Sequence, residues 1–137
     1  MVFGGGFISA ATFLLEVPMR YVIYSDCHQG TPMAVPCEFN MNILANPDHI
    51  WLGDNIDLKY CGKCKLQEYV AILDEAQTVM ESRFISGNHE LMNTHLNSII
   101  HGILFTHGDI TLWGSDMSRQ FRAGQKGQNW TTKNKMV

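Results

Sequence analysis

Short apolar runs recur along this chain, and each of them ends in a small cluster of polar residues. Runs that are short, apolar and bounded by turn-forming residues predict strands over residues 21–24, 50–52, 83–86 and 102–106. Helical spacing of apolar residues is strongest over 66–82, and weaker patterns predict helices over 38–45, 91–99 and 111–121. This alternation predicts an α/β layer sandwich in which many strands are parallel.

The first eighteen residues differ from the rest because they form a broken apolar stretch. A secretory signal starts with positive charge, but no basic residue precedes Arg20. Glu16 and Pro18 close the stretch before it reaches the roughly 20 apolar residues of a membrane span. We therefore expect residues 1–18 to be an apolar extension outside the native domain, with translation starting at Met19. An uncleaved export signal is the alternative.

Charge is distributed unevenly over a chain whose net charge is −3. Residues 1–110 hold five Lys and Arg against twelve Asp and Glu, whereas residues 111–137 hold five against one. The overall balance excludes a protein that is held to nucleic acid by its net positive charge. We expect residues 19–137 to form one domain with a polar, basic tail over 124–137. Trp130 is the only aromatic residue of that tail, which is a weak basis for stacking on nucleobases.

The four cysteines are Cys27, Cys37, Cys61 and Cys64. The last two have the Cys-x-x-Cys spacing of half a zinc site, but no second pair completes such a site. They also lack the preceding strand of a thioredoxin-like redox centre, so we interpret this segment as a loop before a helix. Because no export signal indicates an oxidising compartment, we expect reduced thiols and a cytoplasmic protein.

Four polar clusters follow the predicted strands, at the ends where open α/β sheets assemble their active sites. They are Asp26-Cys-His28, Gly53-Asp54-Asn-Ile-Asp57, Gly87-Asn88-His89-Glu90 and His107-Gly-Asp109. Together they supply carboxylates, imidazoles and one amide, which are ligands suited to Mn, Fe, Zn or Ni. On an extended strand end, Asp26 and His28 point to the same side, so both could bind one ion.

The remaining clusters can hold a second ion. Asp54, from the neighbouring strand end, can bridge the two ions, while Asn88 and His107 bind the second. Two divalent ions about 3.5–4 Å apart can share a hydroxide. They stabilise both the attacking and the leaving oxygen of an in-line displacement at phosphorus. The sequence thus predicts two divalent metal ions, with Mn as the expected metal and Fe, Zn or Ni as alternatives.

The ordered motifs D-x-H, G-D-x-x-D and G-N-H-E, followed by a further His, resemble those of the calcineurin-like metallophosphoesterases over residues 19–110. The resemblance implies that Asp26 and His28 bind the first metal. It also implies that Asp54 bridges the pair and that Asn88 and His107 bind the second.

The same resemblance implies roles next to the substrate. His89 would be a general acid or would stabilise the developing charge, and Asp57 would orient His89. Glu90 matches the motif without an assigned role. Gly53 and Gly87 are expected to let the backbone turn sharply at the metals.

The chain departs from the family after His107. No G-H-x-H motif follows, and no histidine of any kind lies beyond this residue. In the family those two histidines complete the metal ligands, and a following second sheet completes a four-layer αββα sandwich. We therefore expect the N-terminal part of that sandwich, in a C-terminally truncated domain.

The leading hypothesis is an enzyme that hydrolyses phosphomonoesters or phosphodiesters through a metal-bridging hydroxide. The alternative is a metal-binding relic or fragment that lacks the residues needed for turnover. A nucleic-acid-binding module is a third possibility, which the acidic body opposes. We expect a phosphate-ester substrate as partner, no membrane, and nucleic acid only as a substrate. Selectivity is expected in residues 29–37 and 58–65, and the sequence indicates no particular substrate or oligomeric state.

Overall fold

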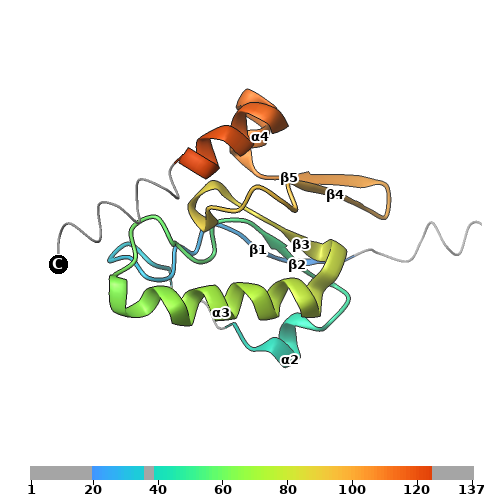
Figure 1. Cartoon of the computed structure of the whole chain (residues 1–137). Helices are drawn as coiled ribbons and strands as arrows, with labels where there is room; N and C mark the ends of the chain where they lie inside the picture. Colours follow the sequence, from blue (N-terminus) through green and yellow to red (C-terminus); the bar gives the residue numbers. More distant parts are fainter. Residues whose placement is uncertain (1–19, 36–38, 125–137) are drawn as a thin grey trace, which may run out of the picture.

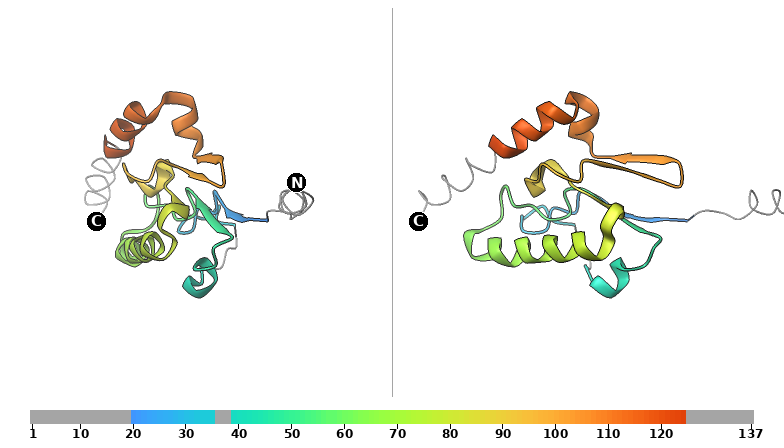
Figure 2. Two further views of the ribbon diagram at one scale, coloured as in Figure 1. Left: turned by 90° about the vertical axis from the view of Figure 1, so that its right-hand side faces the viewer. Right: turned by 45° about the vertical axis from the view of Figure 1, so that its right-hand side comes forward.

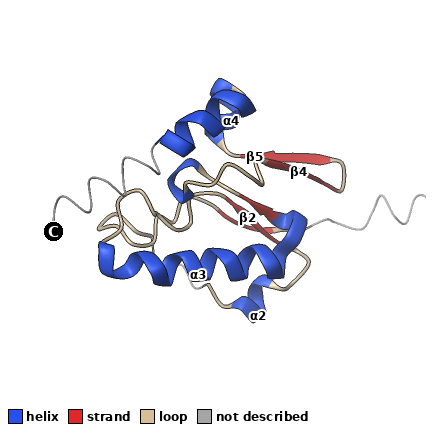
Figure 3. Ribbon diagram, in the orientation of Figure 1, coloured by secondary structure: helices blue, strands red, loops and turns tan. Residues whose placement is uncertain are grey.

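A computed structural model describes residues 20–35 and 39–124. The expectations for residues 1–18 and for 125–137 of the basic tail lie outside the described residues. The described chain is mixed α/β (Figures 1 and 3). Its elements are β1 (Val22–Tyr24), α2 (Met41–Leu44), β2 (His49–Leu52), α3 (Lys63–Met80), the 3-10 turn η1 (Glu81–Arg83), β3 (Phe84–Ile85), the 3-10 turn η2 (Asn88–Glu90), β4 (Asn97–Ile100), β5 (Ile103–Thr106) and α4 (Gly108–Trp113).

Strands β1, β2 and β3 form a parallel sheet in that order. Ile23 pairs with Ile50, and Leu52 pairs with Ile85. The predicted parallel pairing is confirmed for these three strands. Because the carboxyl ends of parallel strands meet at one edge of a sheet, the segments that follow them are brought together there.

The two faces of this sheet are covered by different elements (Figures 1 and 2). Helices α2 and α3 lie against one face, and the hairpin of β4 and β5 lies over the other. Side chains alternate along a strand, so Trp51 packs in the core on the helix side. Its neighbour Ile50 packs on the hairpin side with Ile85 and Phe105. Each large apolar side chain buried in this way contributes about 1.5–3 kcal/mol to folding.

Helix α3 buries one stripe of its surface against the sheet. The stripe consists of Leu66, Leu73, Ala76 and Met80, at the spacing of successive helical turns. The predicted helix over 66–82 is confirmed, although it begins three residues earlier, directly after Gly62. It ends at Met80, because Glu81 has a positive φ of 52° and the chain continues as a 3-10 turn.

The predicted helix over 91–99 is wrong. Leu91 and His95 have φ values of 56° and 57°, and the chain then forms β4, which pairs antiparallel with β5. A two-residue turn at His101 and Gly102 joins the two strands, and both residues have the positive φ that a tight hairpin turn requires. The apolar spacing of this segment fits a helix as well as a strand, and the pairing with β5 decides between them.

Two further helices differ from their predicted bounds. Helix α2 begins at Met41, and the side chain of Asn40 accepts a hydrogen bond from the backbone N–H of Asn42 at 2.9 Å. The helix predicted over 111–121 is divided into α4 and a second helical segment over 115–124. Gly114, with φ of 79°, separates the two.

The cysteines depart in part from the expectation of reduced thiols. Cys27 is disulfide-bonded, so that expectation is wrong at this residue. Cys61 is buried in the loop before α3, and Cys64 is exposed in the first turn of this helix. The interpretation of Cys-x-x-Cys as a loop leading into a helix is therefore confirmed.

Among the helices of the described residues, none is both long and apolar enough to cross a membrane.

Candidate metal centre

Residues that follow three different strands meet at one edge of the sheet. Asp26 follows β1, Asp54 follows β2 and His107 follows β5. The Nε2 atom of His107 lies 3.3 Å from Oδ2 of Asp54 and 3.5 Å from Oδ1 of Asp26. One imidazole nitrogen therefore faces two carboxylates. We refer to Asp26, Asp54 and His107 as the first ligand group.

The first ligand group fits a divalent cation. Its three donor atoms all lie within 4.8 Å of one another. Ligands about 2.1 Å from one ion are roughly 3–3.5 Å apart, so small side-chain movements would bring all three donors onto one ion. Two carboxylate oxygens and an imidazole nitrogen are a donor set suited to Mn, Fe or Zn.

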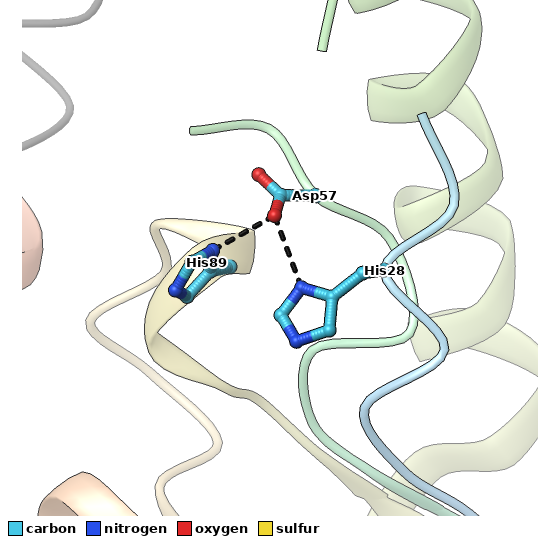
Figure 4. Close-up of side chains that lie close together, drawn as sticks. All are labelled: His28, Asp57 and His89. Carbon is cyan, nitrogen blue, oxygen red and sulfur yellow. Dashed lines mark hydrogen bonds and ion pairs between the residues drawn. The ribbon is translucent and has the colours of Figure 1, made fainter. Parts of the chain in front are cut away.

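A second ligand group consists of His28, Asp57 and His89 (Figure 4). The Nδ1 atoms of His28 and His89 both donate to Oδ2 of Asp57, at 3.0 and 2.8 Å. The predicted contact between Asp57 and His89 is thus present. The contact between Asp57 and His28 was not predicted from the sequence. In both rings the other nitrogen points away from Asp57 (Figure 4). Asp57 therefore fixes the orientation of two imidazoles.

His28 connects the two ligand groups. Its Nε2 atom lies 3.8 Å from Oδ1 of Asp26, while its Nδ1 atom faces Asp57. The proximity of Asp26 and His28 was predicted from an extended backbone, and that reason is wrong. Both residues, and Asp54 as well, have left-handed φ values of 56°, 50° and 56°. Backbone N–H groups of Asp26 and His28 donate to the carbonyls of Gly53 and Asp54, at 3.0 and 2.9 Å, which holds the two loops together.

Two glycines allow these loops to approach closely. Gly53 has a positive φ of 80°, and a Cβ atom there would lie 2.6 Å from Cδ2 of His107. The sharp turn expected at Gly53 is confirmed. Gly87 has φ of −102°, which any residue adopts, so the expected reason is wrong at this position. Gly87 is needed because a Cβ atom would overlap the side chain of Asp54.

The G-N-H-E segment forms η2, directly after β3. The backbone N–H of His89 donates to Oδ1 of Asp54 at 2.7 Å, which leaves Oδ2 of Asp54 facing His107. Asn88 begins η2, directly before His89, and is partly exposed. The motif therefore shapes the site through its backbone as well as through its side chains.

Glu90 has a structural role that the sequence analysis missed. Its buried carboxylate accepts hydrogen bonds from Nε1 of Trp51 at 2.8 Å, from the N–H of Gly87 at 2.9 Å and from the N–H of Asn55 at 3.3 Å. These donors come from β2 and from the loops that carry Asp54 and His89. Complete burial raises the pKa of Glu90 to about 7, although the N–H donors favour the charged form.

Electrostatics in the first ligand group favour a bound cation. Burial raises the pKa of Asp54, and the nearby histidines lower it by a smaller amount. Burial also lowers the pKa of His107, but its hydrogen bond with Asp109 and the charges of Asp54 and Asp26 outweigh this effect and raise that pKa overall. A positive charge between these carboxylates therefore stabilises their ionised form.

The second ligand group is an ionised carboxylate between two histidines. Burial raises the pKa of Asp57, but hydrogen bonds from His89, from the N–H of Tyr60 and from His28 outweigh it, so the pKa is lowered. The hydrogen bond to Asp57 also raises the pKa of His89. His89 therefore retains its proton more readily than an ordinary histidine. The ring of Tyr60, which is exposed, also lies near His89, with 5.7 Å between the ring centroids.

A buried ion pair contacts His107 on the Nδ1 side of its ring, opposite the carboxylates of Asp54 and Asp26. Its Nδ1 atom donates to Oδ1 of Asp109 at 3.2 Å, and Asp109 is paired with Arg122 at 2.7 Å. The H-G-D motif drew attention to the segment that holds Asp109, but no signal in the sequence distinguished Arg122 from the other basic residues near the C-terminus.

Comparison with known proteins adds no relative. No protein-family model, no curated protein and no solved structure matches the chain.

Proposed function

We propose that this chain is a metal-dependent phosphoesterase that hydrolyses phosphomonoesters or phosphodiesters. The observation that carries the proposal is the convergence of His107 Nε2 on the carboxylates of Asp54 and Asp26, at 3.3 and 3.5 Å, from three separate strand ends. The resemblance of the motifs to calcineurin-like metallophosphoesterases gives the same chemistry. It also suggests that the helix-covered sheet and the hairpin are part of a four-layer αββα sandwich.

Asp26, Asp54 and His107 would hold one divalent cation, and His28 would add a ligand through Nε2. This assignment differs from the sequence prediction, in which His107 binds the second cation with Asn88 and Asp54 bridges the two, because His107 Nε2 lies 3.5 Å from Asp26 as well as 3.3 Å from Asp54. Asn88, which begins η2 directly before His89, is the amide ligand expected for a second cation. When bound, divalent cations supply Lewis-acid activation of the water that attacks phosphorus. The chain itself holds these donor atoms in position. The Asp54 carboxylate, for example, accepts a hydrogen bond from the backbone N–H of His89.

His89 is the group we propose as the general acid. Its Nδ1 atom is held by Asp57, and its raised pKa favours a ring that also carries a proton on Nε2. That nitrogen points away from Asp57 (Figure 4). A proton at this position can be transferred to the leaving alkoxide when the P–O bond breaks.

The test is Mn²⁺-dependent hydrolysis of bis(p-nitrophenyl) phosphate by the purified 137-residue chain, with metal content measured on the same sample. Asp54→Asn removes a buried ligand charge, and we expect it to abolish turnover and Mn²⁺ binding. Asp74→Asn, on the exposed side of α3, is the matched control because it makes the same chemical change away from the site. This variant should retain wild-type activity.

Three results have different meanings. Turnover that is lost only in Asp54→Asn supports the phosphoesterase proposal. Mn²⁺ binding without turnover would contradict it and favour a metal-binding relic. Turnover that persists in Asp54→Asn would show that the activity does not come from this site, and the assignment of the site would then be wrong.

A further inference from the structure

Arg122 is completely buried, although it lies in a basic segment that would ordinarily be solvated. A guanidinium carries five N–H donors and no acceptor, so a buried arginine is costly unless each donor is satisfied. Here all five are. Nε and Nη2 donate to Oδ2 and Oδ1 of Asp109, at 2.8 and 2.7 Å. The remaining donors bind Ser86 Oγ, the Met92 carbonyl and the Ser86 carbonyl, at 2.7, 3.0 and 3.2 Å.

These acceptors lie on both sides of the candidate centre. Ser86 and Met92 flank the segment that includes η2, and Asp109 follows His107 in the first turn of α4. Arg122 therefore connects the loop after β3 to the corner after β5. Ser118, from the same helical segment as Arg122, adds a hydrogen bond from its Oγ to the Asp109 carbonyl at 3.1 Å.

Asp109 transmits this support to His107. The carboxylate that Arg122 holds in a bidentate pair also accepts from Nδ1 of His107, at 3.2 Å. A proton fixed on Nδ1 leaves the lone pair of a neutral imidazole on Nε2. That is the nitrogen that faces Asp54 and Asp26. Outer hydrogen bonds of this kind orient a histidine ligand and select its tautomer.

We propose that Arg122 and Asp109 are positioning residues that fix the ring and tautomer of His107, so that its Nε2 is presented to a metal. This inference rests on the proposed function for the presence of a metal. The orientation and tautomer of His107 can be tested without one.

The first experiment measures the Kd of Mn²⁺ for Arg122→Met, Arg122→Lys and Asp109→Asn, using only protein shown by circular dichroism to be folded. We expect each variant to bind Mn²⁺ about 10- to 100-fold more weakly, as is typical when a partner of a metal ligand is lost. Lysine at 122 should not rescue binding, because it cannot form the bidentate pair.

Two arginines provide matched controls. Arg119→Met removes an exposed arginine of the same helical segment, whose pair with Asp116 is 3.4 Å long, and it should leave the Kd unchanged. Arg83→Met removes an arginine that holds backbone carbonyls away from the centre. It should lower stability without changing the Kd. If Arg83→Met weakened Mn²⁺ binding as much as Arg122→Met, loss of stability would explain the result and the positioning role would be wrong.

The second experiment records the ring ¹⁵N chemical shifts of His107 in the metal-free protein at alkaline pH, where the imidazole is neutral. We expect the tautomer protonated on Nδ1 in the wild type and a mixture in Asp109→Asn, or in Arg122→Lys if Asp109→Asn does not fold. Unchanged shifts in the variant would overturn the proposal. A wild type that binds no Mn²⁺ would refute the proposed function, and the ¹⁵N shifts would then decide the positioning role alone.

Discussion

At the scale of single residues, Glu90 shows how one buried carboxylate organises a site without facing it. It binds the indole of Trp51 and the backbone of the two loops that carry Asp54 and His89. Removing the acceptors while keeping the shape would leave buried N–H donors unpaired, at a cost of about 1–3 kcal/mol. Glu90 thus connects the core of the sheet to the candidate centre.

The raised pKa of Glu90 predicts a pH dependence of stability. Its pKa is about 7 in the folded chain, against an ordinary value of 4.5. The folded state therefore binds more protons between these pH values, so stability from this group is complete below about pH 4.5 and is lost as the pH rises through 7. The loss amounts to roughly 3 kcal/mol.

Glu90→Gln tests this prediction because an amide does not titrate. We expect the free energy of unfolding of the wild type to fall relative to that of Glu90→Gln between pH 4.5 and 7.5. Urea denaturation of both proteins in the presence of a chelator measures the difference. Parallel pH profiles would show that Glu90 does not titrate in this range.

The residues closest to the candidate centre were predictable, whereas their supports were not. Asp26, Asp54 and His107 stand at strand ends, which short apolar runs mark in the sequence. Arg122 differs from its basic neighbours only by its burial, and burial depends on how the helical segment over 115–124 packs on the rest of the chain. A pattern along the chain carries no information on such long-range contacts.

At the scale of elements, prediction succeeded where one pattern was unambiguous. The long stripe of α3 and the three parallel strands were correctly predicted. The segment before β5 was not, because its apolar residues fit two periodicities. The discriminating signal was the pair His101-Gly102, which occupies the tight turn between two apolar runs. The following run was correctly predicted as a strand, but the prediction over 102–106 counted Gly102 as the first residue of that strand and so did not recognise the turn.

Arg83 joins the end of α3 and η1 to the segment between α2 and β2. Its Nη1 group donates to the carbonyls of Leu44, Asn46 and His49, at 3.1, 2.6 and 2.8 Å. We expect Arg83→Met to lower the free energy of unfolding by about 1–3 kcal/mol, because these carbonyls lose a charged donor. Chemical denaturation measures this value. A change below about 0.5 kcal/mol would mean that water replaces the guanidinium.

At the scale of the whole molecule, the candidate centre is a product of the complete fold. The first ligand group joins residues 26, 54 and 107, which lie in three loops on one edge of the sheet. The unfolded chain does not hold these donors together. A cation that binds them therefore binds the folded state and stabilises every element at once.

This arrangement predicts that Mn²⁺ stabilises the chain. At a free concentration about 100 times its Kd, a ligand specific for the folded state adds about 2.7 kcal/mol. We expect Mn²⁺ to raise the Tm and a chelator to reverse the shift, as measured by circular dichroism. Asp54→Asn should lose the effect. An equal shift in that variant would place the ion at other acidic residues.

The left-handed backbone at Asp26, His28 and Asp54 has a consequence for the evolution of such a chain. A left-handed conformation costs most L-residues about 1–2 kcal/mol, but Asp and His are several-fold enriched among the side chains that adopt it. Glycine would relax the backbone and remove the donor atom, and at position 54 it would also leave the N–H of His89 without its acceptor. The backbone at these positions therefore restricts the residues that fold well there to a short list, and Asp and His are the members of that list that bring a carboxylate or an imidazole to the site.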